Sequence, residues 1–205
     1  MSKFLKIAAL SLALILISAL VAQAAKPRLR YGLQWGYSAK VASAGQYTYR
    51  TSMGYRVSDD NPLYADYYTN AFVSADLGLE FLNWFALTAR FGYKGIAKDY
   101  RVMPAELQLA VFPKGYENSG LFGFASGGMA LYDLSLDDGV TLFSAGVGLR
   151  RNLSRKISLD GFLKAGYTVC SPLPVDQYEG KIPRESVVYS RAQHISVDLG
   201  LALYF

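Results

Sequence analysis

Residues 71–94 read AFVSADLGLEFLNWFALTARFGYK, two alternating stretches separated by a break at 82–84. Every odd position from 73 to 81 is apolar, and the even positions between them hold Ser, Asp, Gly and Glu. The odd positions from 85 to 93 are apolar again, with Thr, Arg and Gly among the residues between them. A period of two is typical of a β-strand whose two faces have different surroundings. The segment therefore predicts two antiparallel strands joined by a tight turn.

The same alternation recurs along most of the chain. It predicts eight strands, at 29–41, 71–81, 85–94, 102–112, 120–132, 140–150, 157–170 and 191–205, of which 120–132 has the weakest pattern. Short connections at 82–84, 113–119 and 151–156 are interleaved with the segments 42–70, 95–101, 133–139 and 171–190, two of which are long. Strands of about ten residues with short turns at one end and longer loops at the other are typical of outer-membrane barrels. The sequence thus predicts an all-β fold, an eight-stranded antiparallel up-and-down transmembrane β-barrel.

The first 24 residues have the pattern of a secretory signal peptide. Lys3 and Lys6 form a positive n-region, Ile7–Val21 an apolar h-region, and Ala22-Gln23-Ala24 a small-x-small cleavage site. A transmembrane anchor is the alternative, but the apolar run is shorter than the roughly 20 residues that a helical span needs. We expect cleavage after Ala24, which leaves residues 25–205 as a single barrel domain.

Composition excludes several classes of protein. The chain is 52% hydrophobic and 14% aromatic, with a net charge of +5, which excludes a disordered protein. A single cysteine, Cys170, and the lack of a Cys/His cluster exclude a disulfide scaffold and a structural zinc site. We expect no cofactor and no metal. The modest charge and the export signal together argue against nucleic acid as a partner.

A soluble β-sandwich or lipocalin-like barrel would show the same alternation, so the polarity of the two faces must distinguish a soluble fold from a membrane barrel. A soluble barrel keeps its apolar face inside. Here the second face is small or Gly-rich with a few charges at mid-strand, which fits a narrow polar interior within a lipid-facing wall. Aromatic residues fall toward strand ends, which predicts two interfacial belts. The expected members are Trp84, Phe85, Phe112 and Tyr116 near the short turns, and Tyr37, Phe72, Tyr93, Tyr132 and Tyr167 near the loops.

The last strand carries apolar residues at alternate positions and ends in phenylalanine: Val197, Leu199, Leu201, Leu203 and Phe205. This pattern resembles the assembly signal of outer-membrane β-barrel families, and the size and strand count resemble the small barrels of the OmpA/OmpX type. The resemblance covers the whole mature chain. It implies a bacterial outer-membrane location, contact with outer-membrane lipids, and insertion by the barrel assembly machinery. Nothing after Phe205 corresponds to the peptidoglycan-binding domain of OmpA.

One interior layer gathers charged and polar side chains. We expect Gln34, Asp76, Arg90, Glu106, Lys164 and Asp198 at a similar depth. Folding the chain about the centres of its connections places Asp76 opposite Arg90, Arg90 opposite Glu106, and Lys164 within one residue of Asp198. A charge in a confined interior is tolerated only when it is paired. The layer therefore predicts a packed plug, and the alternative is a small channel lined by the same charges.

Two further groups of residues suggest functions. His194 and Ser196 form a His-x-Ser pair on one strand face, which faintly resembles the lipid A deacylases built on eight-stranded barrels. Those enzymes present their catalytic groups to lipid, whereas both residues here have inward parity, so we expect no enzyme and no catalytic residue. Tyrosines gather in loops 42–70 and 171–190, which is consistent with a binding surface, with loops that fold on themselves, or with strands that continue beyond the membrane. The candidates are Tyr47, Tyr49, Tyr55, Tyr64, Tyr67, Tyr68 and Tyr178.

The favoured function is non-enzymatic, either an envelope structural role or a surface interaction through loops 42–70 and 171–190. The partner of such a surface would be an extracellular ligand or a host surface. A narrow passive pore is the first alternative, and a lipid-modifying enzyme is the second.

Overall fold

The computed structural model describes residues 27–96, 101–133, 139–176, 178 and 180–205. The expected signal peptide lies outside these residues, as do the middle parts of the connections 95–101 and 133–139. Among the described residues, eight long strands form the main body of the chain. They are β1 (Arg28–Arg50), β2 (Arg56–Phe81), β3 (Phe85–Gly95), β4 (Arg101–Val111), β5 (Gly120–Asp133), β6 (Thr141–Asn152), β7 (Ser158–Cys170) and β10 (Val187–Tyr204).

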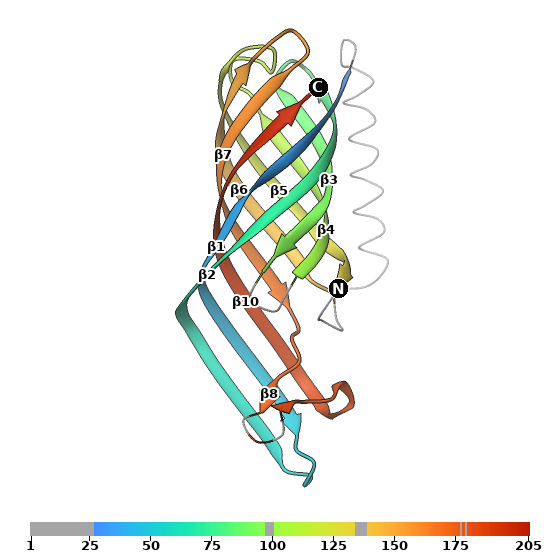
Figure 1. Cartoon of the computed structure of the whole chain (residues 1–205), viewed down its shortest axis with the longest axis vertical. Coiled ribbons are helices and arrows are strands. Elements are labelled where there is room, and N and C mark those ends of the chain that lie inside the picture. Colours follow the sequence, from blue (N-terminus) through green and yellow to red (C-terminus); the bar gives the residue numbers. More distant parts are fainter. Residues whose placement is uncertain (1–26, 97–100, 134–138, 177, 179) are drawn as a thin grey trace.

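The eight strands close into a barrel. Each strand pairs antiparallel with its neighbours in the order β1-β10-β7-β6-β5-β4-β3-β2, and β2 pairs back to β1 (Figure 1). The predicted fold class is confirmed. Closure leaves the barrel wall without a free strand edge, so its backbone groups bond to one another without water.

The segment 42–70 is not a loop, which corrects that assignment and bears out the alternative that strands continue beyond the membrane. β1 continues to Arg50 and β2 begins at Arg56, and the two strands pair over most of this length, as far as Arg50 with Arg56. Together with the start of β10, which pairs with β1 up to Tyr49 opposite Val187, they form a three-stranded sheet. We call this extension, residues 42–70 and 187–194, the projecting sheet; it extends below the barrel in Figure 1.

Two irregularities explain why this part of the ladder escaped prediction. Register shifts occur between Lys40 and Ala42 and between Ser43 and Gly45 of β1, where β2 contains extra residues. Pro62 falls at the second shift, and a proline is tolerated in a strand at such a bulge because it has no N–H to donate to the ladder. Each bulge also reverses the alternation of side chains, so the period of two is lost from the sequence.

The segment 171–190 contains a two-stranded ribbon and one short helix. β8 (Val175–Asp176) pairs with β9 (Gly180–Lys181), and a single 3₁₀ turn at Arg184–Ser186 leads into β10. The loop is tied to the projecting sheet, since the Tyr49 hydroxyl donates to Asp176 and the Ser190 hydroxyl to the Pro172 carbonyl oxygen. Strand β10 therefore begins at Val187, four residues earlier than the alternation predicts.

Candidate functional site

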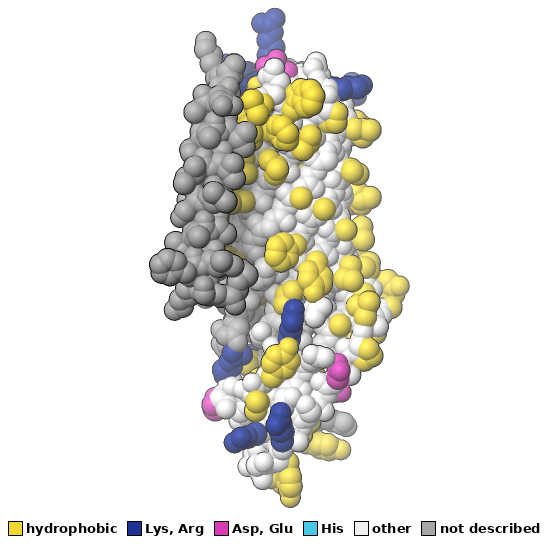
Figure 2. Space-filling model, turned by 180° about the vertical axis from the view of Figure 1, so that it is seen from behind, with side chains coloured by type: hydrophobic (Ala, Val, Ile, Leu, Met, Phe, Trp, Pro, Cys, Tyr) yellow, Lys and Arg dark blue, Asp and Glu magenta, His cyan; other side chains and the backbone are white. Residues whose placement is uncertain are grey.

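The outer wall of the barrel is apolar on every strand. The space-filling view shows hydrophobic side chains spread over the wall, with charged side chains at its two ends (Figure 2). The exposed large residues of the wall are Leu29, Tyr31, Leu33, Trp35, Tyr37, Val73, Leu77, Phe91, Leu107, Leu109, Val111, Leu121, Met129, Leu131, Phe143, Val147, Leu149, Leu163, Tyr167, Val197, Leu199 and Leu201. An apolar exterior around a charged interior reverses the arrangement of soluble barrels. The wall is that of a barrel that spans a membrane.

The expected aromatic belts are only partly present. Trp84 and Tyr37 are exposed by 56% and 67%. Trp84 lies in the short turn between β2 and β3, and Tyr37 lies near the other end of the wall, opposite Ala71. Phe72, Phe112 and Tyr116, by contrast, are buried and belong to one core cluster inside the barrel, so their assignment to the belts was wrong. Phe72 has the inward parity of Ser74 and Asp76, and the 113–119 turn folds Tyr116 back over the barrel end. The Tyr132 side chain lies outside the described part of the structure.

At the middle of the lumen, Arg90 joins two carboxylates from neighbouring strands. Asp76 and Glu106 both stand directly opposite it in the ladder, at the positions expected from the sequence. The guanidinium donates to both Asp76 oxygens at 3.0 and 3.1 Å and lies 4.0 Å from Glu106. Tyr204 adds a hydrogen bond of 2.7 Å to Asp76. The result is a fully buried, charge-paired network.

A second network centres on Asp198, which is completely buried. Lys164 stands opposite it in the ladder, as expected, with its amine 3.6 Å from the carboxylate. A closer partner is Lys94, at 2.8 Å, and Ser38 donates a hydrogen bond of 2.6 Å. Sequence reasoning missed Lys94 because β3 and β10 are not neighbours. Only closure of the barrel brings their inward side chains together across the lumen. Gln34, expected in the same layer, is buried as well.

A third network, near the short turns, was also missed. Arg150 donates to both oxygens of Asp160 at 2.8 and 2.7 Å, and shares Glu80 with Arg30. Arg150 and Asp160 stand directly opposite each other in the ladder. A symmetric turn at 151–156 would not pair them, but β6 continues to Asn152 and shifts the register. The even, inward-facing positions of these charged residues were the feature of the sequence that could have predicted this network.

Charge and packing close the lumen. Among the described residues, six basic and five acidic side chains are buried, namely Arg30, Lys40, Arg90, Lys94, Arg150 and Lys164 against Asp76, Glu80, Glu106, Asp160 and Asp198. Buried aromatic rings, including Phe122, Phe124 and Phe162, pack on one another between the charged networks. The two cavities lined by Arg90 within the lumen hold only about 10 Å³ each. The packed interior is that of a plugged barrel.

His194 does not pair with Ser196. Its ring nitrogen Nδ1 lies 2.9 Å from the hydroxyl of Ser43, which donates to Asp66 at 3.0 Å. Ser43, and not Ser196, is therefore the hydroxyl beside the His194 ring. Lys40 completes this rim cluster by pairing with Asp66 at 2.5 Å, at the first bulge of β2.

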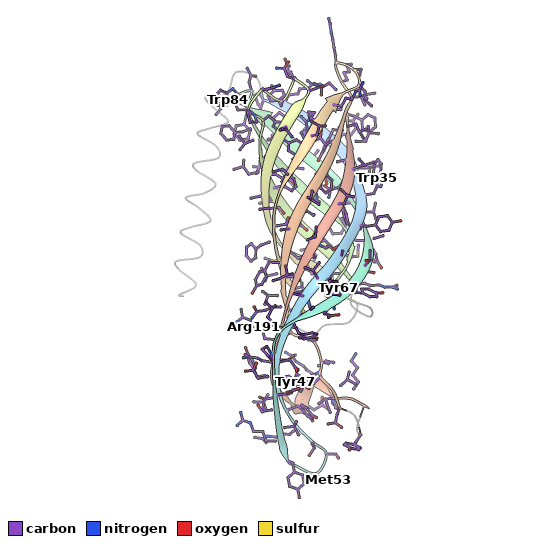
Figure 3. All side chains as sticks on the ribbon, turned by 90° about the vertical axis from the view of Figure 1, so that its left-hand side faces the viewer. Trp35, Tyr47, Met53, Tyr67, Trp84 and Arg191 are labelled. Carbon is purple, nitrogen blue, oxygen red and sulfur yellow. The ribbon has the colours of Figure 1, made fainter. Side chains whose placement is uncertain are left out.

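The tyrosine candidates have different environments. Tyr55, Tyr64, Tyr67 and Tyr178 are exposed by 51% to 90%, and Tyr68 is half-buried. Tyr49 is only 3% exposed, since it packs beneath the 171–186 loop, and so it does not form part of an accessible surface. In the side-chain view, Tyr47 lies on the projecting sheet, Met53 at its tip and Tyr67 where the sheet leaves the barrel (Figure 3).

Tyr47 forms a cross-strand pair with Asp59 on the projecting sheet. Its hydroxyl donates to the carboxylate at 2.7 Å, and Asn61 donates to the same carboxylate. The hydrogen bond to Asp59 raises the pKa of Tyr47 to about 12. The hydrogen bonds from Tyr47 and Asn61 in turn hold the pKa of Asp59 below its usual value.

Two other kinds of feature were searched for in the described part of the chain. No group of three or more His, Cys, Asp or Glu side chains is arranged to hold a metal ion. Among the same residues, no helix has the length and hydropathy to cross a membrane.

No protein-family model and no curated protein matches this chain in sequence. Three solved structures are similar in fold. The outer membrane protein OprG of Pseudomonas aeruginosa is 12% identical, over 86% of this chain and 95% of OprG, with a TM-score of 0.45. Neisserial surface protein A is 10% identical over 87% of this chain and 98% of its own, with a TM-score of 0.37. The Yersinia pestis attachment invasion locus protein Ail, solved with a heparin analogue, is 14% identical over 87% and 99%, with a TM-score of 0.37. At these TM-scores the similarity does not extend to function.

Proposed function

We propose that this protein is a non-enzymatic barrel of the bacterial outer membrane that presents the projecting sheet to an extracellular ligand or host surface. The observation that carries the proposal is the contrast between a lumen filled by paired charges and a sheet that extends β1, β2 and β10 beyond the apolar wall.

The packed lumen argues against a pore. Eight strands leave an interior just wide enough for side chains, and here those side chains form three ion-paired networks with aromatic rings between them. Opening a passage would break several buried ion pairs, and breaking one such pair costs about 3–5 kcal/mol. The protein therefore has little means to conduct solutes.

The projecting sheet has the properties of a contact surface. Its strands are hydrogen-bonded over their length, so its side chains are held on a fixed frame. Tyrosine supplies large contact area with little loss of conformational entropy, which is why binding surfaces use it. Tyr55, Tyr64 and Tyr67 stand exposed on or beside this sheet, with Tyr178 on the adjoining loop. Exposed aromatic side chains on a rigid frame favour recognition of another molecule.

The decisive test shortens the projecting sheet without disturbing the barrel. Gly45 pairs with Asn61, so replacing 46–60 by an Asn-Gly turn keeps the remaining pairing of β1 with β2, between this pair and the barrel, in register. Cells displaying the full-length protein are expected to adhere to cultured epithelial cells or to immobilised serum and matrix proteins, and cells displaying the shortened protein are not. Both proteins should show the same shift in electrophoretic mobility on heating, which reports an intact barrel.

Point variants refine this test. Tyr64→Ala with Tyr67→Ala should reduce adhesion, whereas Tyr31→Ala, which removes a tyrosine of the barrel wall whose exposure lies between theirs, should leave it unchanged. Adhesion that survives the shortening combined with Tyr64→Ala and Tyr67→Ala would refute the role of the sheet. Steady, large single-channel conductance of the purified protein in planar bilayers would support the pore instead.

A further inference from the structure

A cavity of about 460 Å³ is lined by residues of the short turns and adjoining strand ends. This end of the barrel lies opposite the projecting sheet (Figure 1). Five basic side chains line it, against the two carboxylates Glu80 and Glu117. The basic residues are Arg28, Arg30, Arg150, Arg155 and Lys156. A concave site with an excess of one charge concentrates ions of the opposite sign.

One wall of this cavity is an ordered turn. The N–H groups of Leu153 and Ser154 both donate to the Ile157 carbonyl oxygen, at 2.9 and 3.1 Å. The Ser154 hydroxyl accepts from the N–H groups of Lys156 and Ile157. Arg28 of β1 donates to the Arg155 carbonyl oxygen at 2.9 Å and ties the turn to the opposite wall. The hydrogen-bonded backbone of this turn places Arg155 and Lys156 at the cavity, which both residues line.

The floor of the cavity is closed and charge-paired. Arg30 and Arg150 share Glu80 at 3.0 and 3.2 Å, Arg150 also holds Asp160, and Arg30 lies over the Tyr204 ring at 3.6 Å. One buried donor on this floor, Arg30 Nε, has no hydrogen-bond partner.

At the rim the basic groups lack such partners. Arg28 forms its ion pair with the exposed Glu117 at 3.9 Å, and Arg155 and Lys156 form none within the described part of the chain. Uncompensated positive charge therefore lies at the mouth of the cavity, above a neutral floor.

We propose that this cavity binds a water-soluble, phosphate-bearing anion from the aqueous compartment on the short-turn side, held chiefly by Arg28, Arg155 and Lys156. Guanidinium groups bind phosphate oxygens through two parallel hydrogen bonds, and an ammonium adds a point charge. The volume falls within the range of small-molecule sites. A soluble source is favoured over a lipid headgroup, because the lining residues face the mouth of the lumen and not the lipid-facing wall. The paired floor prevents the anion from passing further.

The test uses the full chain folded in detergent micelles, with sodium pyrophosphate as the probe and isothermal titration calorimetry as the measurement. We expect saturable binding at one site per chain. The double variant Arg155→Ala/Lys156→Ala should weaken it by about tenfold or more, since charge-assisted contacts are lost. The matched control, Lys114→Ala/Arg151→Ala, removes two exposed basic residues from the same end that do not line the cavity, and should change affinity by less than about twofold.

Three results would overturn the proposal. They are the absence of pyrophosphate binding, an equal loss in both double variants, and binding that is seen only with phosphatidylglycerol vesicles. The second result would indicate a general effect of charge, and the third a contact with lipid headgroups. Heat-dependent mobility of every variant checks that the barrel remains folded.

Discussion

Strands β1, β2 and β10 pass through two environments, and their side chains differ between them. Within the barrel, exposed residues such as Leu33 and Leu199 alternate with buried ones such as Gln34 and Asp198. In the projecting sheet the alternation fails, and most residues of β2 from 56 to 65 are exposed on both faces. Lipid accepts only apolar outward side chains, whereas water solvates either face of a strand. The comparison teaches that the period of two reports a strand whose two faces have different surroundings, here lipid and a packed lumen, and that it is lost where water reaches both faces.

The largest expected effect comes from removing a buried carboxylate in the barrel. Asp198→Ala leaves Lys94 and Lys164 without their shared partner in a closed lumen. We expect the free energy of unfolding to fall by about 3–5 kcal/mol. Asp60→Ala, which removes an exposed carboxylate from the projecting sheet, should change it by less than about 0.5 kcal/mol. Urea denaturation in lipid vesicles, followed by tryptophan fluorescence, measures both; similar losses would mean that the two regions do not differ.

Two glycines of β1 sharpen the comparison on a single strand. At Gly36, in the barrel, an added Cβ would meet the Leu199 carbonyl oxygen and lie 2.6 Å from the Gly200 Cα. At Gly45, in the projecting sheet, the nearest atom would be 4.0 Å away. We expect Gly36→Ala to cost about 1–3 kcal/mol of unfolding free energy and Gly45→Ala to cost less than about 0.5 kcal/mol. The same urea denaturation measurements test this prediction. Equal losses of unfolding free energy in the two variants would contradict the close packing of the barrel.

The smallest expected effect is the pH dependence of the projecting sheet. Because the folded-state pKa of Asp59 is depressed, its contribution to stability is complete above the usual value of 3.8 and is lost as pH falls through the folded pKa. The pKa of Tyr47 is raised to about 12, so its contribution is complete below 10 and is lost as pH rises toward 12. NMR titration should show both shifts, and Tyr47→Phe should return the pKa of Asp59 toward 3.8. An unchanged Asp59 titration in that variant would rule out the pair.

The sequence predicted the barrel because the membrane imposes a pattern on it. The ladder pairs Asp76 with Arg90 and Arg90 with Glu106, as connection centres alone predicted, and Lys164 with Asp198, which the centre of 171–190 predicted to within one residue. The projecting sheet was missed because bulges and water remove the alternation, and Lys94 was missed because its partner lies across the lumen. Phe112 was misplaced although it continues the inward parity of β4, and Tyr116 was misplaced because the 113–119 turn folds it back over the barrel end.

The central claim is that the barrel wall faces lipid while the projecting sheet faces water. Spin labels attached to single cysteines in a Cys170→Ala background test it directly, through their accessibility to oxygen and to a water-soluble nickel complex. Labels at Leu107, Val147 and Leu199 should be accessible to oxygen and shielded from nickel, and labels at Tyr64 and Tyr67 should show the reverse. Nickel accessibility at the wall positions equal to that of the projecting sheet would contradict the claim.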